Sequence, residues 1–199
     1  EFGGIAVVKP TDPEREGFIF AGWYLGDDKW DFSDPVDHSM TLTALWVAAR
    51  FTVTFDANGG QFANGTEITS TTVDYNQVIA TVETPTYEGR TFAGWLDQDG
   101  NPWAVGTPVT RTLTLTAQWD VNYYTVQFDP NGGNWDGSTA SQVVEVTYGT
   151  IANVKPADPV KEGYIFLGWY QNDQLWNFNN DKVTEDITLT AKWENATFT

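Results

Sequence analysis

The chain of 199 residues carries 27 acidic and 10 basic side chains, a formal net charge of −17, and it contains no cysteine. This acidity argues against nucleic acids and anionic membranes as partners, because both attract Lys and Arg, and the missing cysteines exclude disulfides, thiolate metal sites and cysteine nucleophiles. Hydrophobic residues make up 41% of the chain, so a packed core is expected, and no apolar run approaches the ~18 residues of a membrane-spanning helix.

One heptapeptide occurs three times and organises the chain. It reads G-F-I-F-A-G-W at 17–23, G-R-T-F-A-G-W at 89–95 and G-Y-I-F-L-G-W at 163–169. A second tryptophan follows each copy, and each copy closes with a threonine-rich alternating segment that ends in a third tryptophan. The copies are about 70 residues apart, more than the roughly 20–50 residues of solenoid repeats, so each unit is expected to have a small core of its own.

We therefore expect a tandem array with a partial repeat at 1–46, complete repeats at 51–119 and 124–193, and the start of a following repeat at 194–199. The chain is expected to be a piece of a longer array. The partial repeat lacks the opening strands of the other two, which leaves sheet edges unpaired, and exposed edges recruit strands. We predict that it exchanges a strand with a neighbouring chain or is poorly ordered.

The opening segments of both complete repeats predict a strand and a tight turn. Apolar residues alternate with polar ones at 51–55 and 124–128, a pattern typical of half-buried strands. Asp56 and Asp129 then begin turns whose Asn-Gly pairs supply the positive φ angles that a hairpin needs, with the aspartate as an Asx cap. Alternating runs at 71–75 and 144–148 predict the returning strands.

The second half of each repeat predicts a connector and two further strands. The proline-punctuated connectors at 84–89 and 155–163 suit one short helical turn and no more. The segment 163–169 carries apolar residues on both faces, so we predict that it is central in its sheet. In the last segment, Ile187, Leu189, Ala191 and Trp193 share one face of a strand. Each complete unit thus has about four strands, and the fold class is mainly β.

The order of these motifs resembles a known family. The pattern F-D-x-N-G-G, then V-x-Y-G, then P-x-x-x-G-Y-x-F-x-G-W-Y, then L-T-A-x-W is similar to the Listeria–Bacteroides repeat, also called the internalin B-type B-repeat. In the third copy it stands at 128–133, 146–149, 159–170 and 189–193. The second copy departs from the pattern at Asn76 and Leu96, and the first copy lacks F-D-x-N-G-G.

The resemblance implies small α+β, β-grasp-like units within bacterial surface or secreted multidomain proteins. Members of the family serve as repeat stalks and adhesin modules, and the family offers no catalytic residues to transfer to this chain. We therefore expect a location at the bacterial cell surface, no enzymatic activity and no cofactor.

Few residues have the pattern of a catalytic or metal site. His38 is the only histidine, so histidine-based triads and metal sites lack partners. The Asp-rich turns at 56–58 and 129–131 superficially suggest calcium loops, but they lack the alternating ligands and the distal glutamate of an EF-hand. No metal site is predicted.

The tryptophans are the candidates for binding. Six of them lie in strand patterns and are expected in the core: Trp23, Trp46, Trp95, Trp119, Trp169 and Trp193. Trp30, Trp103 and Trp176 lie in polar loops, and Trp135 follows the turn of the third repeat, where the second repeat has Phe62. Two interpretations stay open for these four rings: they cap the open end of the core, or they are exposed to bind a ligand.

The sequence thus favours a stalk or spacer that presents another domain away from a cell wall. The alternative is a binding module for a carbohydrate or a host or neighbouring-cell protein, with Trp30, Trp103, Trp135 and Trp176 as the ligand-binding residues. Neither hypothesis involves nucleic acid or membrane insertion.

Overall fold

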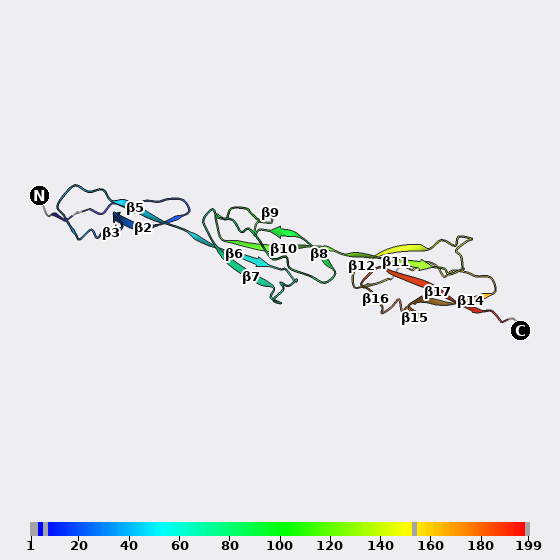
Figure 1. Cartoon of the computed structure of the whole chain (residues 1–199). Helices are drawn as coiled ribbons and strands as arrows, with labels where there is room; N and C mark the ends of the chain where they lie inside the picture. Colours follow the sequence, from blue (N-terminus) through cyan, green and yellow to red (C-terminus); the bar gives the residue numbers. More distant parts are fainter. Residues whose placement is uncertain (1–3, 6–7, 153–154, 198–199) are drawn as a thin grey trace. The chain divides into compact units, whose positions relative to one another are not determined.

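The computed structural model describes residues 4–5, 8–152 and 155–197, which form strands and no helix (Figure 1). The first repeat contains β1 (Gly4–Ile5), β2 (Phe18–Leu25), β3 (Asp28–Lys29), β4 (Pro35–Val36) and β5 (Thr43–Ala48). The second contains β6 (Arg50–Asp56), β7 (Ile68–Asp74), β8 (Arg90–Leu96), β9 (Pro102–Trp103) and β10 (Leu113–Val121). The third contains β11 (Tyr123–Asp129), β12 (Gln142–Thr147), β13 (Thr150–Ile151), β14 (Tyr164–Gln171), β15 (Gln174–Leu175), β16 (Lys182–Val183) and β17 (Ile187–Asn195). The expectation of a mainly β chain is confirmed.

The chain divides into two compact units whose border does not follow the repeats. One unit comprises Glu1–Pro85 and Gly94–Gln118, and the other comprises Thr86–Ala93 and Trp119–Thr199. The segment Thr86–Ala93 of the second repeat therefore packs with the third repeat.

Both complete repeats build a five-stranded mixed sheet in the same order. The order is β7-β6-β10-β8-β9 in the second repeat and β12-β11-β17-β14-β15 in the third. The first and last long strands of each repeat run parallel, through Val53–Asp56 with Leu113–Thr116 and through Val126–Asp129 with Ile187–Thr190. This pairing places β10 and β17 at the centre of their sheets.

The prediction that 163–169 is the central strand is therefore wrong. The outer neighbour of β14 is β15, which has only two residues. The apolar residues on the outer face of β14, Ile165 and Leu167, are 53% and 45% exposed. Apolar residues therefore occupy both faces of β14, although one of these faces is exposed to solvent. The parallel pairing that sets the strand order joins segments far apart in the sequence.

The core of each complete repeat lies on one face of its sheet. In the third repeat the buried cluster comprises Val126, Phe128, Val146, Ala152, Trp169, Val183, Ile187, Leu189 and Ala191. The predicted alternation of the last strand is confirmed, because Ile187, Leu189 and Ala191 are buried while Thr188 is exposed. Trp95 and Trp169 are buried as expected, whereas Trp119 and Trp193 are half-buried.

In the third repeat, the local sequence signals predicted the turn at 129–132 correctly but not the connector at 155–163. Asn131 and Gly132 have φ angles of 47° and 82°, and Asp129 Oδ1 accepts a hydrogen bond from the Asn131 N–H at 2.8 Å. The predicted Asn-Gly turn and Asx cap are confirmed. The expected short helical turn does not form at 155–163, where Pro156 and Pro159 lack N–H donors and disfavour the α conformation in the residues before them.

The first repeat has a smaller sheet and an incomplete core. Among its described residues, 8–49, no side chain is buried, and Trp23 is only half-buried. In the later repeats the last strand begins where the alternating sequence pattern begins, at Leu113 and Ile187. In the first repeat the pattern begins at Met40, but β5 begins only at Thr43. Where β10 and β17 pair with an opening strand, β5 lies at the edge of the sheet β3-β2-β5. Strand exchange through this edge stays a prediction.

Candidate functional site

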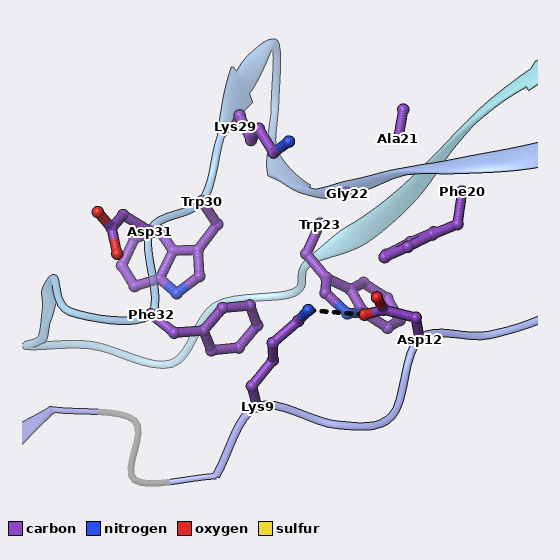
Figure 2. Close-up of a pocket in the computed structure, with 10 residues that line it drawn as sticks. All are labelled: Lys9, Asp12, Phe20, Ala21, Gly22, Trp23, Lys29, Trp30, Asp31 and Phe32. Atoms are coloured by element: carbon purple, nitrogen blue, oxygen red, sulfur yellow. Dashed lines mark ion pairs between the residues drawn. The ribbon is translucent and has the colours of Figure 1, made fainter.

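A pocket of about 680 Å³ lies beside β2 in the first repeat (Figure 2). Four aromatic rings line it, those of Phe20, Trp23, Trp30 and Phe32. An ion pair lies beside them, in which Lys9 Nζ is 2.8 Å from Asp12 Oδ1. The backbone N–H of Trp30 donates a hydrogen bond to the Trp23 carbonyl oxygen at 2.8 Å. This bond ties the polar loop to the strand.

The third repeat contains the counterpart of this pocket, with a volume of about 330 Å³. The rings are those of Phe166, Trp169, Trp176 and Phe178. Lys155 Nζ lies 2.5 Å from Asp158 Oδ1. The Trp176 N–H donates to the Trp169 carbonyl oxygen at 2.8 Å, as in the first repeat. Phe128 of β11 stacks on Phe178 with 6.2 Å between the ring centroids.

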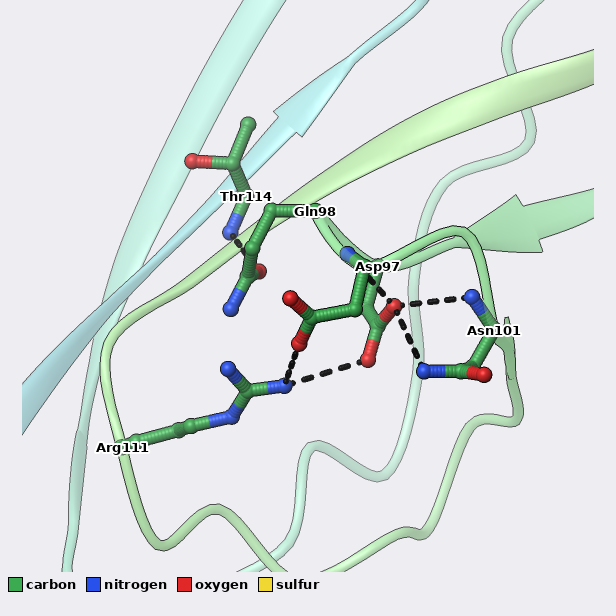
Figure 3. A network of polar contacts seen from close by, with 6 residues as sticks. Asp97, Gln98, Asn101, Arg111 and Thr114 are labelled. Atoms are coloured by element: carbon green, nitrogen blue, oxygen red, sulfur yellow. Dashed lines mark hydrogen bonds and ion pairs between the residues drawn. The ribbon is translucent and has the colours of Figure 1, made fainter.

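The second repeat does not reproduce this chemistry. Its connector, 84–89, contains no lysine, and neither does the segment 76–83 before it. The loop after β8 is instead held by Asp97, whose Oδ1 accepts hydrogen bonds from the N–H groups of Asp99 at 3.0 Å and Asn101 at 2.9 Å (Figure 3). The Asn101 N–H is the main reason that the pKa of Asp97 lies below its usual value. Arg111 lies 3.2 Å from Asp97 and 2.8 Å from Asp99, but it is half exposed, so these ion pairs stabilise the loop only weakly.

The four predicted binding tryptophans are all half-buried. Trp30 and Trp176 line the two pockets, whereas Trp103 packs edge-on against Phe55 with 6.1 Å between ring centroids. The indole N–H groups of these three are buried and donate to no acceptor among the described residues, so the rings contribute apolar surface. Trp135 stacks on Trp169 at 6.1 Å, and its indole N–H donates to the Ala157 carbonyl oxygen at 2.6 Å.

A second constellation joins consecutive repeats, and we call the first example joint 1, formed by Glu16, Gly17, Ala49 and Tyr75. The Tyr75 ring covers Gly17 so closely that a methyl group on Gly17 would overlap it. The Ala49 N–H donates to the Gly17 carbonyl oxygen at 2.8 Å, and the Tyr75 N–H donates to the Ala49 carbonyl oxygen at 2.7 Å. The linker residue is thus bonded to both repeats.

Joint 2, formed by Glu88, Gly89, Asn122 and Tyr148, repeats this arrangement. The Tyr148 ring covers Gly89, and the Tyr148 hydroxyl donates a hydrogen bond to the Glu88 carboxylate. The Asn122 N–H donates to the Gly89 carbonyl oxygen at 3.0 Å, and the Tyr148 N–H donates to the Asn122 carbonyl oxygen at 2.9 Å. The positive φ of Gly89, 72°, and the covering ring both require glycine at this position.

The pKa values of both joint tyrosines lie above the ordinary value of 10.0, because of burial and the neighbouring glutamates. For Tyr148 the largest cause is the hydrogen bond to Glu88, followed by burial and by the Glu88 charge. For Tyr75 burial comes first, followed by the charge of Glu16. The joints therefore favour protonated tyrosines.

This shift predicts a loss of stability at alkaline pH. Because the folded-state pKa of Tyr148 lies above the unfolded value, its stabilising contribution is full below about pH 10 and is lost as the pH rises through the folded pKa. Tyr148→Phe, which keeps the ring but cannot ionise, should weaken the alkaline loss when thermal unfolding is followed across this range. Tyr123→Phe, at a tyrosine 61% exposed, should leave the loss unchanged. Equal pH profiles for parent and Tyr148→Phe would contradict the assignment.

The joints were not among the features predicted from the sequence. The signal was available in part, because a glutamate directly precedes the first glycine of the repeated heptapeptide in all three repeats. A tyrosine also ends the alternating runs 71–75 and 144–148 of the two complete repeats. Neither motif indicates by itself that Tyr75 meets Gly17, since the two belong to different repeats.

The other residues considered from the sequence were the single histidine and the acidic side chains that could bind a metal ion. His38 is exposed and forms an ion pair with the neighbouring Asp37. Within the described ranges, no group of three or more His, Asp or Glu side chains is arranged to hold a metal ion. The same part of the chain contains no helix with the length and apolarity needed to cross a membrane.

The sheets and the joints define a protein class: a tandem array of small mixed-sheet repeats connected by tyrosine-on-glycine contacts. The family model of the Listeria-Bacteroides repeat domain matches residues 3–45, 51–118 and 124–192. The chain belongs to this family.

Three relatives have the same level of identity. Two proteins of Evansella cellulosilytica named as membrane proteins, one of them Gly-rich, are 36% identical over 98% and 97% of this chain. Internalin H of Listeria monocytogenes is 36% identical over 79% of it. The chain spans only 23%, 29% and 27% of the length of these three proteins.

Proposed function

We propose that the chain is a non-catalytic spacer in a bacterial cell-surface protein, where joined repeats act as a stalk in an adhesin-like or other multidomain protein. The observation that carries this proposal is the joint, which is built from the same contacts in both places where it occurs. Membership of the Listeria-Bacteroides repeat family and the similarity to internalin H support the extracellular, surface location.

The linkers favour a spacer that resists bending. A Gly/Ser-rich linker would behave as a flexible coil, whereas Ala49 and Asn122 are each bonded to the repeats on both sides. Two backbone hydrogen bonds contribute about 0.5–1.5 kcal/mol each, and the tyrosine ring adds apolar burial on top of them. Bending at a joint would have to break these contacts together.

The spacer function predicts that joint 1 restricts motion within its unit. The chain has no cysteine, so Asp27→Cys and Thr114→Cys, both at exposed positions, can carry the only two spin labels. We expect a narrow distance distribution in the parent and a clearly wider one in Tyr75→Ala, because the ring and its burial are lost. Pulsed dipolar spectroscopy measures both.

Thr71→Ala is the matched control, since Thr71 lies in β7 close to Tyr75 and is exposed. It should leave the distance distribution unchanged. A distribution that is already broad in the parent, or that does not respond to Tyr75→Ala, would contradict a spacer held by its joints.

The recurring pocket favours a second candidate function, the binding of a carbohydrate or of a host or neighbouring-cell protein. An indole face is suited to stacking on a sugar ring, and the Lys9–Asp12 and Lys155–Asp158 pairs place a donor and an acceptor beside the rings. This candidate assigns Trp30 and Trp176 to ligand contact. Two similar pockets on one chain would increase avidity for a repetitive ligand.

A glycan array tests the second candidate. We expect the parent to bind and the double variant Lys9→Met with Lys155→Met to lose binding, because it removes the polar pair and leaves the rings in place. Lys182→Met, at another exposed lysine, should bind like the parent. Trp30→Ala with Trp176→Ala, after its fold has been verified, should also lose binding. A parent that binds no glycan would argue against carbohydrate as the ligand.

A further inference from the structure

The third repeat presents the same Glu-Gly corner as the two joints, with its glycine uncovered. Gly163 has a φ of 78°, close to the 74° and 72° of the glycines in joints 1 and 2. The Ala196 N–H donates to the Gly163 carbonyl oxygen at 2.8 Å, as the linker residue does in both joints. Yet no heavy atom of the described chain lies within 4 Å of the place where a methyl group on Gly163 would stand.

The side chains around Gly163 match those of joint 1. In joint 1 the Phe18 ring meets the Tyr75 ring edge-on at 6.1 Å, and Arg15 covers the Phe18 ring at 4.0 Å. In the third repeat Tyr164 takes the place of Phe18, and Lys161 lies 4.4 Å from the Tyr164 ring centroid. Tyr164 is 42% exposed, so its ring is accessible to a partner.

A hydrogen-bond acceptor completes the site. Glu162 precedes Gly163 as Glu88 precedes Gly89, and it is exposed. In joint 2 the corresponding carboxylate accepts the hydrogen bond of the Tyr148 hydroxyl. Glu162, Gly163 and Tyr164 together form what we call the third socket. Gly163 provides the uncovered backbone, Tyr164 the adjacent aromatic ring and Glu162 the hydrogen-bond acceptor.

We propose that the third socket binds a tyrosine side chain from a further repeat of the same type that continues from the linker at Ala196. The two filled sockets define the occupant, since each holds the tyrosine that directly follows the second long strand of the next repeat, β7 or β12. Phenylalanine would cover the glycine but leave the Glu162 carboxylate without its donor. This inference rests on the proposed function, because it takes the joint as the unit from which the array is built.

The test extends the full chain by one repeat. A copy of residues 53–119 is appended after Thr199, so that 196–199 replace the similar segment 49–52. Amide hydrogen exchange is measured by NMR at the appended copy of Tyr75. We expect exchange there to be slower by about fivefold or more than in the same extended chain carrying Gly163→Ala, which corresponds to about one backbone hydrogen bond.

Two further variants keep the result interpretable. Changing the appended tyrosine to alanine, with Gly163 intact, should speed the exchange of the Ala196 amide. Gly100→Ala is the control, since Gly100 has a φ of 81° and open space around it, and it should leave both amides unaffected. Equal exchange with and without Gly163→Ala would overturn the proposal, as would protection that depends on chain concentration, because a second copy would then occupy the socket.

The outcomes separate this inference from the spacer function. If Tyr75→Ala fails to widen the distance distribution within the parent, the spacer function fails whatever the extended chain shows. If that distribution widens as expected but the appended tyrosine is unprotected, only the third socket is refuted.

Discussion

Gly89→Ala is expected to open joint 2 and to destabilise the unit that contains the third repeat by about 2–4 kcal/mol. Two effects add at this position. Alanine at a φ of 72° is strained, and its methyl group would overlap the Tyr148 ring, which would have to leave. Displacing that ring also breaks the hydrogen bond to Glu88. Amide exchange at Asn122 and Tyr148 measures the opening directly.

Gly163→Ala in the 199-residue chain is the matched control. Gly163 follows a glutamate, as Gly89 does, and has nearly the same φ, but there is open space where the methyl group would stand. It should cost only the backbone strain, about 1–2 kcal/mol. If the two substitutions destabilise the chain equally, the tyrosine-on-glycine contact has no energetic role and the joints do not connect the repeats.

Trp169→Ala is expected to unfold the third repeat while the sheet of the second repeat persists. Trp169 is 1% exposed and contacts the rings of Phe128 at 5.0 Å and Phe166 at 5.5 Å. Removing such a ring costs about 3–5 kcal/mol, and a unit of this size seldom has more than roughly that from its core. The NMR signals of β17 should lose their dispersion, and those of β10 should keep it.

Trp23→Ala tests the same position in a different environment. Trp23 is half-buried beside the large pocket, and no opening strand packs over it among the described residues. Its removal should therefore cost less, about 1–2 kcal/mol. A loss as large as that of Trp169→Ala would mean that the first repeat has a core comparable to the complete ones.

The core of each complete repeat is linked to its Glu-Gly corner through one strand, β8 in the second repeat and β14 in the third. Gly89 precedes β8 and Gly163 precedes β14, the strands that carry Trp95 and Trp169. A repeat whose core is intact therefore holds its Glu-Gly corner in place for the next tyrosine. The net charge of −17 makes chains of this protein repel one another. One of the acidic groups, Glu88 in joint 2, also accepts the hydrogen bond of the Tyr148 hydroxyl.

Much of each repeat could be predicted from the sequence because its signals are local. The Asn58-Gly59 and Asn131-Gly132 pairs specify turns through their own φ angles. The alternation of Ile187, Leu189 and Ala191 specifies which face of a strand is buried, since side chains alternate along any strand. The polar loop with Trp30 or Trp176 was also recognisable, but its sequence left open whether the ring caps the core or meets a ligand.

The sequence by itself determined the number of repeats, the strands, the turns and the mainly β class, because repetition and period-two patterns depend only on neighbouring residues. Only the tertiary structure decided that β17, and not β14, is central, because the parallel pairing with β11 joins the two ends of a repeat. It also decided that Tyr75 and Tyr148 rest on the glycines of the preceding repeats. Those contacts connect residues whose sequence neighbours carry no information about each other, so the joints became visible only in the fold.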